Sequence, residues 1–367
     1  MIYIHRLLLI FCVAYVAFLF AGFASQIVEF LWRYFFLREL PQLYQIYSGS
    51  SATDVSLKDE PRTGAKSGTW VVITGGSSGQ GREFALQFAR RGFNILLIGS
   101  IRSENTAKMI RNEGVLCAVV VKDFSQAFEP NFFDDIATAI QPLDVALLIN
   151  NIGHRTGWDP YHEAPENIIR DTIACGTLVQ ARLTHMLLPQ LLARLETNPQ
   201  CRSAIVFITA QCSLPNTGFA IPGYVENPVT VPYLATYEAS NAFGYYHAAS
   251  IIAEYKKNYP RLDLLNITPG AVLTENTSSV LTGTPFAVNS EAFVSKVLTF
   301  LGGNVSSGTT CAYWGHAMTS ALIGIAPWYK EPTLREVGKK ISSDYMARYA
   351  KQVKQYEIKK ELKTPSY

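Results

Sequence analysis

A strand, a glycine-rich turn, a helix and a second strand follow one another in residues 68–99, and this unit limits what the chain can fold into. A β-rich apolar run, a stretch of helical periodicity and a second β-rich run occupy residues 70–74, 82–91 and 94–98. Between the first strand and the helix lie Gly75, Gly79 and Gly81. Such a turn presents backbone N–H groups and the positive end of a helix dipole to a diphosphate. The unit predicts a dinucleotide-binding site; a tight turn that binds nothing is the alternative.

Strands and helices continue to alternate after this unit. Buried strands are expected at residues 71–74, 95–98, 116–121, 145–150, 204–209, 262–267 and 309–314. Helical stretches between them predict an α/β fold of the Rossmann type, in which helices cover both faces of a doubly wound parallel sheet. A chain of 367 residues accommodates one such domain with extensions, so we expect a single domain.

Composition excludes some classes of function. The net charge is only +3, and no long basic run interleaves with aromatic residues, so nucleic acid is not an expected partner. The hydrophobic fraction of 48% is close to that of ordinary globular proteins, so any membrane contact should be local. The six cysteines are scattered, without a CxxC motif or a histidine cluster at metal-ligand spacing. A reduced, metal-free cytosolic domain is therefore expected.

The N-terminal region contains a long uncharged run at residues 7–28. As a helix it would extend roughly 33 Å, enough for a bilayer core of about 30 Å. A cleaved signal peptide is the competing interpretation, but the run is long for one. Arginines at positions 33 and 38 favour a cytosolic side for the rest of the chain. The expected organisation is a membrane anchor at 1–40, a linker at 41–67, the Rossmann domain at 68–314 and a membrane-proximal helical extension at 315–367.

Four motifs, in this order along the chain, resemble those of the short-chain dehydrogenase/reductase family. They are Thr74-Gly75-x-x-x-Gly79-x-Gly81, Asn150-Asn151-Ile152-Gly153, Tyr237-x-x-x-Asn241 and Pro269-Gly270-x-x-x-Thr274. The resemblance implies a Rossmann domain that binds a nicotinamide cofactor. It also implies that the two asparagines stabilise the centre of the sheet and that Thr274 contacts the nicotinamide side.

Cofactor choice is expected at the end of the second strand. No carboxylate that could bind a ribose 2′-hydroxyl occurs there before Glu104, whereas Ser100 and Arg102 favour the 2′-phosphate of NADP. Arg102 as a merely solvated residue is the alternative. The resemblance adds an adenine contact after the third strand. The complete expected cofactor-binding set is Thr74, Gly75, Ser77, Ser78, Gly79, Gln80, Gly81, Ser100, Arg102, Asp123, Phe124, Asn150, Asn151, Gly153, Tyr237, Asn241, Pro269, Gly270 and Thr274.

The catalytic residues of the family are only partly present. In the family motif YxxxK, the tyrosine donates a proton to the carbonyl oxygen, and the lysine binds the nicotinamide ribose and lowers the tyrosine pKa. Here Tyr237 is retained, and Asn241 replaces the lysine one helical turn later. A neutral Asn241 can still bond ribose hydroxyls, so cofactor binding is expected to survive a loss of rate.

Two further positions also depart from the family pattern. Ala210 occupies the place of the catalytic serine, with Thr209 and Ser213 as neighbouring hydroxyls, and Gly176 occupies the place of a structural asparagine. The candidate catalytic residues are therefore Tyr237, Asn241, Thr209 and Ser213. His154 is a conceivable replacement acid, but a structural histidine is the favoured interpretation.

The C-terminal residues 313–318 and 326–329, together with the N-terminal apolar run, resemble the membrane-bound branch of 17β-hydroxysteroid dehydrogenases and very-long-chain 3-ketoacyl-CoA reductases. This resemblance implies a lipid-like ketone or hydroxy substrate of the acyl-CoA or sterol class. It also implies an endoplasmic-reticulum membrane with a cytosolic catalytic domain, and it allows a homo-oligomer. A weaker resemblance points to 3-ketodihydrosphingosine reductases. Two hypotheses remain: an NADP-linked ketoreductase, and a catalytically impaired nucleotide-binding scaffold or regulator in lipid metabolism.

Overall fold

The computed structural model describes residues 13, 15, 17, 18, 21, 22, 24–49, 68–152, 160–211, 234–275, 277, 281, 283 and 286–325. These residues belong to two compact units, Met1–Glu39 and Leu40–Tyr367. In the first unit, the helical residues 24–31 continue into the π-helical turn η1 (Trp32–Phe36). Within the described ranges, no helix has the length and apolar character that crossing a membrane requires. The expected anchor at residues 7–28 lies only partly within those ranges.

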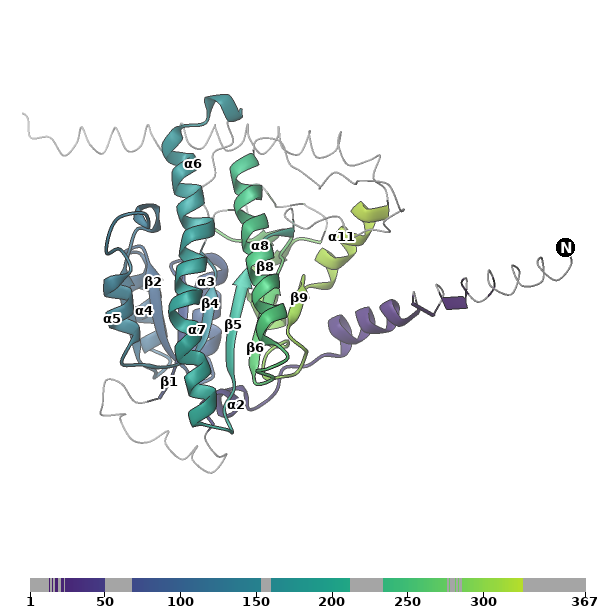
Figure 1. The fold of residues 1–367 in the computed structure, drawn as a ribbon, viewed down its shortest axis with the longest axis horizontal. Coiled ribbons are helices and arrows are strands. Elements are labelled where there is room, and N and C mark those ends of the chain that lie inside the picture. The colour runs from purple at the N-terminus through teal and green to yellow at the C-terminus, as the bar shows by residue number, and fades with distance from the viewer. Residues whose placement is uncertain are drawn as a thin grey trace, which may run out of the picture. The chain divides into compact units, whose positions relative to one another are not determined.

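The second unit is built on a parallel sheet of seven strands in the order β3-β2-β1-β4-β5-β6-β9 (Figure 1). The strands are β1 (Thr69–Thr74), β2 (Asn94–Gly99), β3 (Cys117–Val121), β4 (Asp144–Asn150), β5 (Ser203–Ile208), β6 (Leu262–Ile267) and β9 (Gly308–Thr310). The order reverses between β1 and β4, which is the switch point of a doubly wound sheet. The expected Rossmann-type sheet is thereby confirmed.

The last expected strand, at residues 309–314, is shorter than the apolar pattern suggested. β9 ends at Thr310, and Ala312 has a φ of 57°, a left-handed conformation that cannot continue a strand. Trp314 instead begins helix α11 (Trp314–Ile325). Short apolar runs do not by themselves distinguish a buried strand from the start of a buried helix.

Helices cover both faces of the sheet, as expected (Figure 1). On one face α3 (Gly79–Arg90) packs against α4 (Ser103–Arg111) and α10 (Ser290–Leu298). On the other face α5 (Asp134–Ile140), α7 (Val179–Thr197) and α8 (Ala235–Tyr255) supply side chains to one continuous hydrophobic core beneath the strands. These crossovers bring the loops that follow the strands to one edge of the sheet, where ligands of such folds bind.

The helix that precedes α7 becomes π-helical at Gly176, the position where the family has a structural asparagine. α6 (Glu166–Ile173) passes into the π-helical turn η5 (Ala174–Leu178), which contains the buried Gly176, and then into α7. Single π-helical turns within α-helices often occur at functional sites. The replacement of the expected asparagine by Gly176 therefore falls on a local irregularity of the helix.

The segment expected to be a linker, residues 41–67, departs from that expectation in its first part. Helix α2 (Leu43–Ser48) packs on the Rossmann domain through the buried Leu43 and Tyr47, and Tyr44 lies edge-on against Phe93. Gly49 ends the helix with a φ of 69°, which suits a glycine. The compact unit therefore begins before residue 68. Six residues are too few for helical periodicity to reveal such packing.

The remaining described elements lie beside the carboxyl edge of the sheet. They are the 3₁₀ turns η3 (Phe124–Gln126) and η4 (Tyr161–Glu163) and the short parallel pair β7 (Val272–Leu273) and β8 (Val288–Asn289). η3 follows β3, and β7 follows β6, so both extend loops that leave the carboxyl edge. The expected site residues Gly153 and Ser213, and also His154, lie outside the described part of the chain.

Candidate cofactor site and catalytic residues

The glycine turn after β1 has the close packing that its sequence predicted. Gly75 and Gly79 have φ values of 68° and 55°, a conformation that other residues rarely adopt. At Gly81, a Cβ atom would lie 2.3 Å from Gly75 O, so only glycine lets the first turn of α3 approach the preceding loop. The turn therefore presents backbone, with few side-chain atoms, at the N-terminus of α3, which is the arrangement that accommodates a diphosphate.

Thr74 and Asn151 join the turn to the neighbouring strand β4. The Asn151 backbone N–H donates to Thr74 Oγ1 at 2.9 Å, and Asn151 Nδ2 donates to Thr74 O at 3.2 Å. A side chain at Gly75 would meet the Ile152 backbone at 3.2 Å. These contacts close the ends of β1 and β4 against each other at the switch point, where a dinucleotide would cross from one half of the sheet to the other.

Two buried polar atoms lie at the end of β2 and in the first turn of α3, without a partner in the described part of the chain. Ser100 Oγ and Gln80 Oε1 are buried atoms with no hydrogen-bond partner among the described residues. Buried polar atoms are nearly always paired, so the Ser100 hydroxyl fits an additional polar group, whereas Gln80 Oε1, which only accepts, fits a donor. Arg102 is exposed at the N-cap position of α4, and the side chain of Ser78 makes no capping hydrogen bond at the start of α3. The residues present thus suit the expected cofactor.

The adenine-side residues have structural contacts of their own. Asp123 Oδ1 accepts hydrogen bonds from Ser125 N at 3.1 Å and Ser125 Oγ at 2.9 Å, and so caps η3. Phe124 is only 5% exposed and belongs to the hydrophobic core. Their contact with adenine remains a prediction.

The side chain of Asn150, at the end of β4, is hydrogen-bonded at only one of its two polar atoms among the described residues. Its Nδ2 donates to Thr184 Oγ1 of α7 at 3.0 Å, whereas its Oδ1 is buried without a partner among the described residues. The side chain therefore attaches the central strand to α7, as the motif implied, and leaves one unpaired acceptor.

The loop after β6 returns to the glycine turn. A Cβ atom on Gly79 would lie 3.0 Å from Thr274 Cγ2, so the two motifs are in direct contact although far apart in the sequence. Thr274 is held by Thr277, whose Oγ1 accepts from Thr274 N at 2.9 Å. The structure thus brings Thr74, Gly75, Gly79, Gly81, Asn151 and Thr274 together along the carboxyl edge.

Tyr237 lies in the first turn of α8 and is half-buried. Asn241, one turn later, is only 3% exposed, and its Nδ2 donates to the backbone carbonyl of Tyr237 at 3.0 Å. One N–H of the Asn241 amide is thus engaged within its own helix. Its contact with a ribose, expected from the sequence, remains a prediction.

Thr209 and Ala210 follow β5 at the place of the catalytic serine. Thr209 Oγ1 lies 3.0 Å from Asn266 Oδ1 and 3.2 Å from Ile267 O, so its hydroxyl donates toward β6 within the sheet. Ala210 is buried and has no polar side-chain atom. Among the described residues at the four family positions, Tyr237 alone keeps the family's side chain.

Two residues near the site were not anticipated from the sequence. Gln211 directly follows Ala210, and its N–H donates to Pro269 O at 2.9 Å. His316, in α11, is 1% exposed and lies 3.2 Å, through Nε2, from Ala271 O. The available signals were a polar residue next to a motif position and a histidine in a mostly apolar helix. Neither indicates a partner without the tertiary structure.

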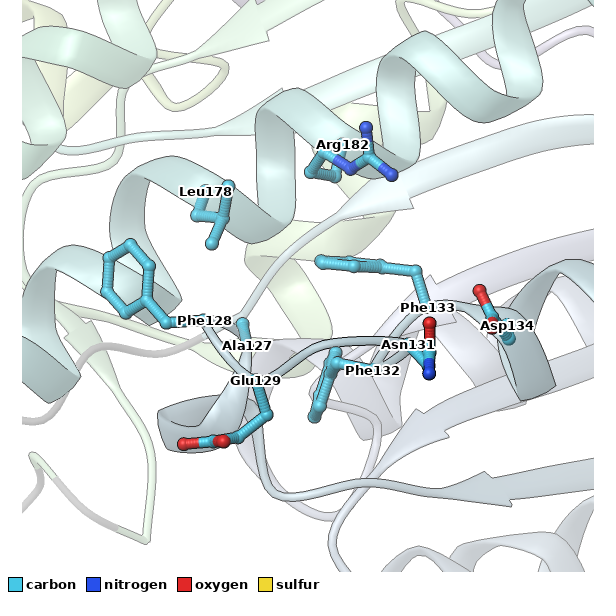
Figure 2. A pocket seen from close by; sticks show the side chains of 9 residues that line it. All are labelled: Ala127, Phe128, Glu129, Asn131, Phe132, Phe133, Asp134, Leu178 and Arg182. Atoms are coloured by element: carbon cyan, nitrogen blue, oxygen red, sulfur yellow. The ribbon is translucent and has the colours of Figure 1, made fainter.

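A separate open cavity of about 320 Å³ lies away from these motifs (Figure 2). Figure 2 shows Leu178 and Arg182 of the η5–α7 helix facing Phe128 and Phe133 of the segment between η3 and α5. The Arg182 guanidinium lies 5.4 Å from the centroid of the Phe133 ring. No expected cofactor-binding or catalytic residue lines this cavity, so the site is defined by the strand ends instead.

Comparisons with known proteins agree with this geometry. The family model for short chain dehydrogenases matches residues 69–284. The very-long-chain 3-oxoacyl-CoA reductase of Aspergillus clavatus is 29% identical over 268 residues, which cover 70% of each chain. The enzyme of the same name from Candida albicans is 28% identical over 307 residues, which cover 81% of each chain.

Solved structures show the same fold. A short-chain dehydrogenase from Sphingobium yanoikuyae in complex with NADPH aligns with a TM-score of 0.52 at 22% identity and covers 71% of this chain and 95% of its own. L-Sorbose reductase from Gluconobacter frateurii, complexed with NADPH and L-sorbose, aligns with a TM-score of 0.51 at 21% identity. The alignment covers 66% of this chain and 94% of the reductase. The two very-long-chain 3-oxoacyl-CoA reductases, at 29% and 28% identity, are relatives to which the chain is similar. The protein belongs to the short-chain dehydrogenase family.

Proposed function

We propose that the protein is a membrane-anchored, NADP(H)-dependent oxidoreductase that acts on a lipid-like ketone or hydroxy compound of the acyl-CoA or sterol class. The observation that carries this proposal is the backbone cradle after β1, in which Gly75, Gly79 and Gly81 leave room for a diphosphate at the N-terminus of α3. The similarity to very-long-chain 3-oxoacyl-CoA reductases supports the substrate class.

The preference for NADP over NAD rests on the end of β2. Ser100 has a buried, unpartnered Oγ within the described part of the chain, and Arg102 is exposed nearby. A guanidinium group at this place accommodates the 2′-phosphate, whereas NAD-specific sites place a carboxylate there. The first carboxylate after β2 is Glu104, which lies 3.9 Å from Arg111.

The proton chemistry is assigned to Tyr237. NADPH, when bound, supplies the hydride, and the Tyr237 hydroxyl donates a proton to the substrate carbonyl oxygen. A tyrosine without assistance has a pKa of about 10. Asn241 carries no charge that could lower that pKa, and Ala210 cannot donate a hydrogen bond to the substrate oxygen. Because a positioned acid contributes about 10² to 10⁴ fold, a chain with this set should turn over slowly.

A second candidate function is cofactor binding without reductase chemistry, in a scaffold or regulator of lipid metabolism. The observation that favours it is the engagement of two candidate polar side chains among the described residues: Thr209 Oγ1 faces Asn266 and Ile267, and Asn241 Nδ2 donates to Tyr237 O. The Thr209 hydroxyl and one amide N–H of Asn241 are then used within the protein. The cradle for the nucleotide is common to both candidates.

An NADPH oxidation assay with a long-chain 3-ketoacyl-CoA separates the two. Slow turnover that disappears in Tyr237→Phe supports the reductase. NADPH binding with no turnover above that of Tyr237→Phe supports the scaffold. Absence of NADPH binding would overturn both.

The membrane attachment rests on residues 7–28, the long uncharged run, and on aromatic residues beyond it. Trp32, Phe35 and Phe36 in η1 are exposed, and amphipathic aromatic side chains such as tryptophan are typical of membrane–water interfaces. The proposed location is the endoplasmic-reticulum membrane with a cytosolic catalytic domain. Carbonate extraction tests it, because an anchored chain stays in the pellet and release of the full chain into the supernatant would contradict the anchor.

A further inference from the structure

Helix α11 is attached to the loop after β6 through His316. The imidazole is 1% exposed and packs against the rings of Tyr313 and Phe293, with centroids 5.1 Å and 5.8 Å away. Its Nε2 lies 3.2 Å from Ala271 O. Burial lowers the pKa of His316, so the ring is neutral at physiological pH, and in the tautomer with a proton on Nε2 it donates to that carbonyl.

Gln211 connects the same helix to the end of β5. Its backbone N–H donates to Pro269 O at 2.9 Å, and its Nε2 donates to His316 O at 2.6 Å and also to Ser320 Oγ. Gln211 therefore bonds both the loop after β6 and α11, while it directly follows Ala210 at the candidate catalytic position.

The side chains of Gln211 and His316 both pack closely against Gly270. A Cβ atom there would lie 2.5 Å from Gln211 Oε1 and 2.9 Å from His316 Cδ2. The loop 269–271 is thus enclosed on one side by the half-buried Gln211 and the buried His316. Its carbonyls are bonded by the Gln211 backbone N–H, at Pro269 O, and by the His316 imidazole, at Ala271 O. Its conformation depends on α11 and on Gln211 as much as on its own sequence.

This loop lies on the half of the sheet that binds the second nucleotide. The strand order reverses between β1 and β4, so a diphosphate at the glycine turn places the two mononucleotides over opposite halves. The loop follows β6 in the half beyond β4, and its Thr274 touches Gly79. It therefore borders the nicotinamide half of the ligand.

We propose that His316 and Gln211 are positioning residues that hold the loop 269–271 in the conformation that accepts the nicotinamide half of the cofactor, which makes α11 part of the cofactor site. This inference rests on the proposed NADP(H) binding. Neither residue needs to touch the cofactor. His316 acts through the Ala271 carbonyl, and Gln211 acts through its backbone bond to Pro269 O and through its side-chain bond to His316 O, which holds α11.

The test compares NADPH with 2′-phospho-ADP-ribose, which lacks the nicotinamide ring, by calorimetry on the full-length protein. His316→Leu keeps an apolar volume but removes the donor, and it should raise the NADPH Kd by about 3- to 10-fold with the 2′-phospho-ADP-ribose Kd unchanged. His316→Gln keeps an amide donor and should recover part of the loss. A merely structural role would weaken both ligands together or neither.

Two further variants keep the test valid if His316→Leu does not fold. Gln211→Met, at similar volume, removes the side-chain bonds to His316 O and Ser320 Oγ and keeps the backbone bond to Pro269 O. Because it releases α11 from Gln211, it should give the same selective loss for NADPH, and the double variant should lose less than the sum of the single changes. His247→Leu is the matched control, since His247 is a half-buried histidine of α8 that bonds Gln180 and not the loop, and both Kd values should stay unchanged.

The outcomes separate this inference from the proposed function. A wild-type protein that binds both ligands, with His316→Leu and Gln211→Met shifting the two Kd values equally or not at all, overturns the positioning role and leaves NADP(H) binding intact. A wild-type protein that binds neither ligand overturns the proposed function and this inference with it.

Discussion

The hydroxyl of Tyr47 donates a hydrogen bond to Asp263 Oδ2 at 2.5 Å and thereby joins α2 to β6. The Asp263 carboxylate also accepts from Arg202 Nη2 at 2.6 Å and from Gly302 N at 3.1 Å. Asp263 lies at the amino end of its strand, so this network is at the edge of the sheet opposite to the cofactor site. Substitutions here should change stability and leave nucleotide binding unchanged.

Tyr47→Phe should lower the free energy of unfolding by about 1.5–3 kcal/mol, because it removes a buried hydrogen bond to a charged acceptor. Chemical denaturation measures the change. Tyr44→Phe is the matched control on the same helix, since Tyr44 is half-buried, and its effect should stay within about 0.5 kcal/mol. Equal effects of the two substitutions, or a change in the NADPH Kd of Tyr47→Phe, would contradict the assignment.

Alkaline pH should destabilise the protein through Tyr47. Burial, followed by the neighbouring Asp263 charge, raises the pKa of Tyr47 well above its ordinary value. The unfolded chain loses this proton near a pH of about 10, whereas the folded protein retains it to higher pH. Stability is therefore fully present below that pH and falls as the pH rises above it. Unfolding free energies measured across this range should fall less steeply in Tyr47→Phe, and identical slopes would refute the prediction.

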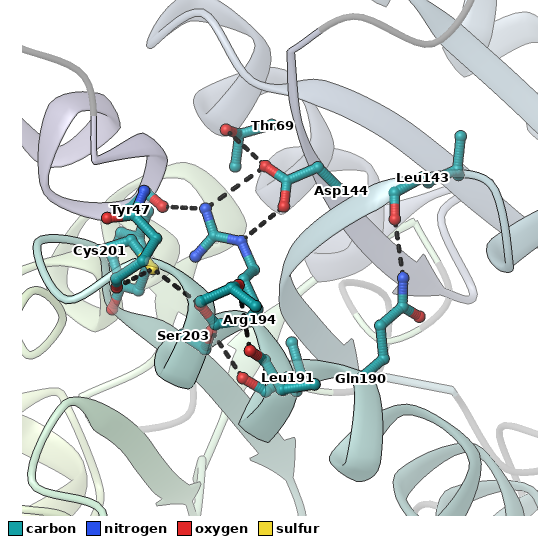
Figure 3. Close-up of polar contacts among 12 residues, drawn as sticks. Tyr47, Thr69, Leu143, Asp144, Gln190, Leu191, Arg194, Cys201 and Ser203 are labelled. Atoms are coloured by element: carbon teal, nitrogen blue, oxygen red, sulfur yellow. Dashed lines mark hydrogen bonds and ion pairs between the residues drawn. The ribbon is translucent and has the colours of Figure 1, made fainter.

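Arg194→Met should lower the free energy of unfolding by about 2–4 kcal/mol. The guanidinium is buried and donates to Asp144 Oδ1 at 2.7 Å, to Arg202 O at 2.7 Å and to Tyr47 O (Figure 3). Methionine fills similar space but leaves these carbonyls unpaired. Arg194→Lys should restore only part of the stability, because one ammonium group cannot reproduce the fork of contacts. Full restoration by lysine would show that charge alone matters.

Arg102→Ala should reduce the preference for NADPH over NADH by about 10-fold without changing the melting temperature, since the side chain is exposed at the cofactor end of α4. Fluorescence titration with both cofactors measures the ratio. Lys108→Ala, exposed on the same helix but in its last turn, should leave the ratio unchanged. An unaltered ratio in Arg102→Ala would place the discriminating contact elsewhere.

Gly79→Val should abolish binding of both cofactors, because a side chain there meets Thr274 in a backbone conformation that valine rarely adopts.

Asn241→Lys combined with Ala210→Ser should raise turnover of a 3-ketoacyl-CoA by part of the roughly 10² to 10⁴ fold that a positioned acid supplies. The lysine would lie one helical turn from Tyr237, and the serine would provide the missing hydroxyl at the end of β5. Steady-state kinetics measure the gain. The same double substitution in a Tyr237→Phe background is the control and should show no gain. Wild-type turnover that persists in Tyr237→Phe would identify a different acid, with His154 the first to examine.

The sequence by itself determined the Rossmann-type sheet and the position of its glycine turn. The apolar runs that became β1, β2 and β4 are continuous and buried along nearly their whole lengths, so local pattern sufficed. Glycine spacing likewise reports a local requirement, because positive φ values at Gly75 and Gly79 are properties of the turn. The family motifs added the identity of Tyr237 and the absence of its usual lysine and serine partners.

Only the tertiary structure decided which polar groups are engaged. Packing places Asn266 Oδ1 3.0 Å from the hydroxyl of the candidate Thr209, and it joins α2, in the segment expected as a linker, to β6 through Tyr47 and Asp263. Gln211 and His316 likewise meet across 105 residues of chain. A hydrogen bond depends on the distance and direction between two atoms, and packing brings those atoms together from segments whose local patterns contain no information about each other.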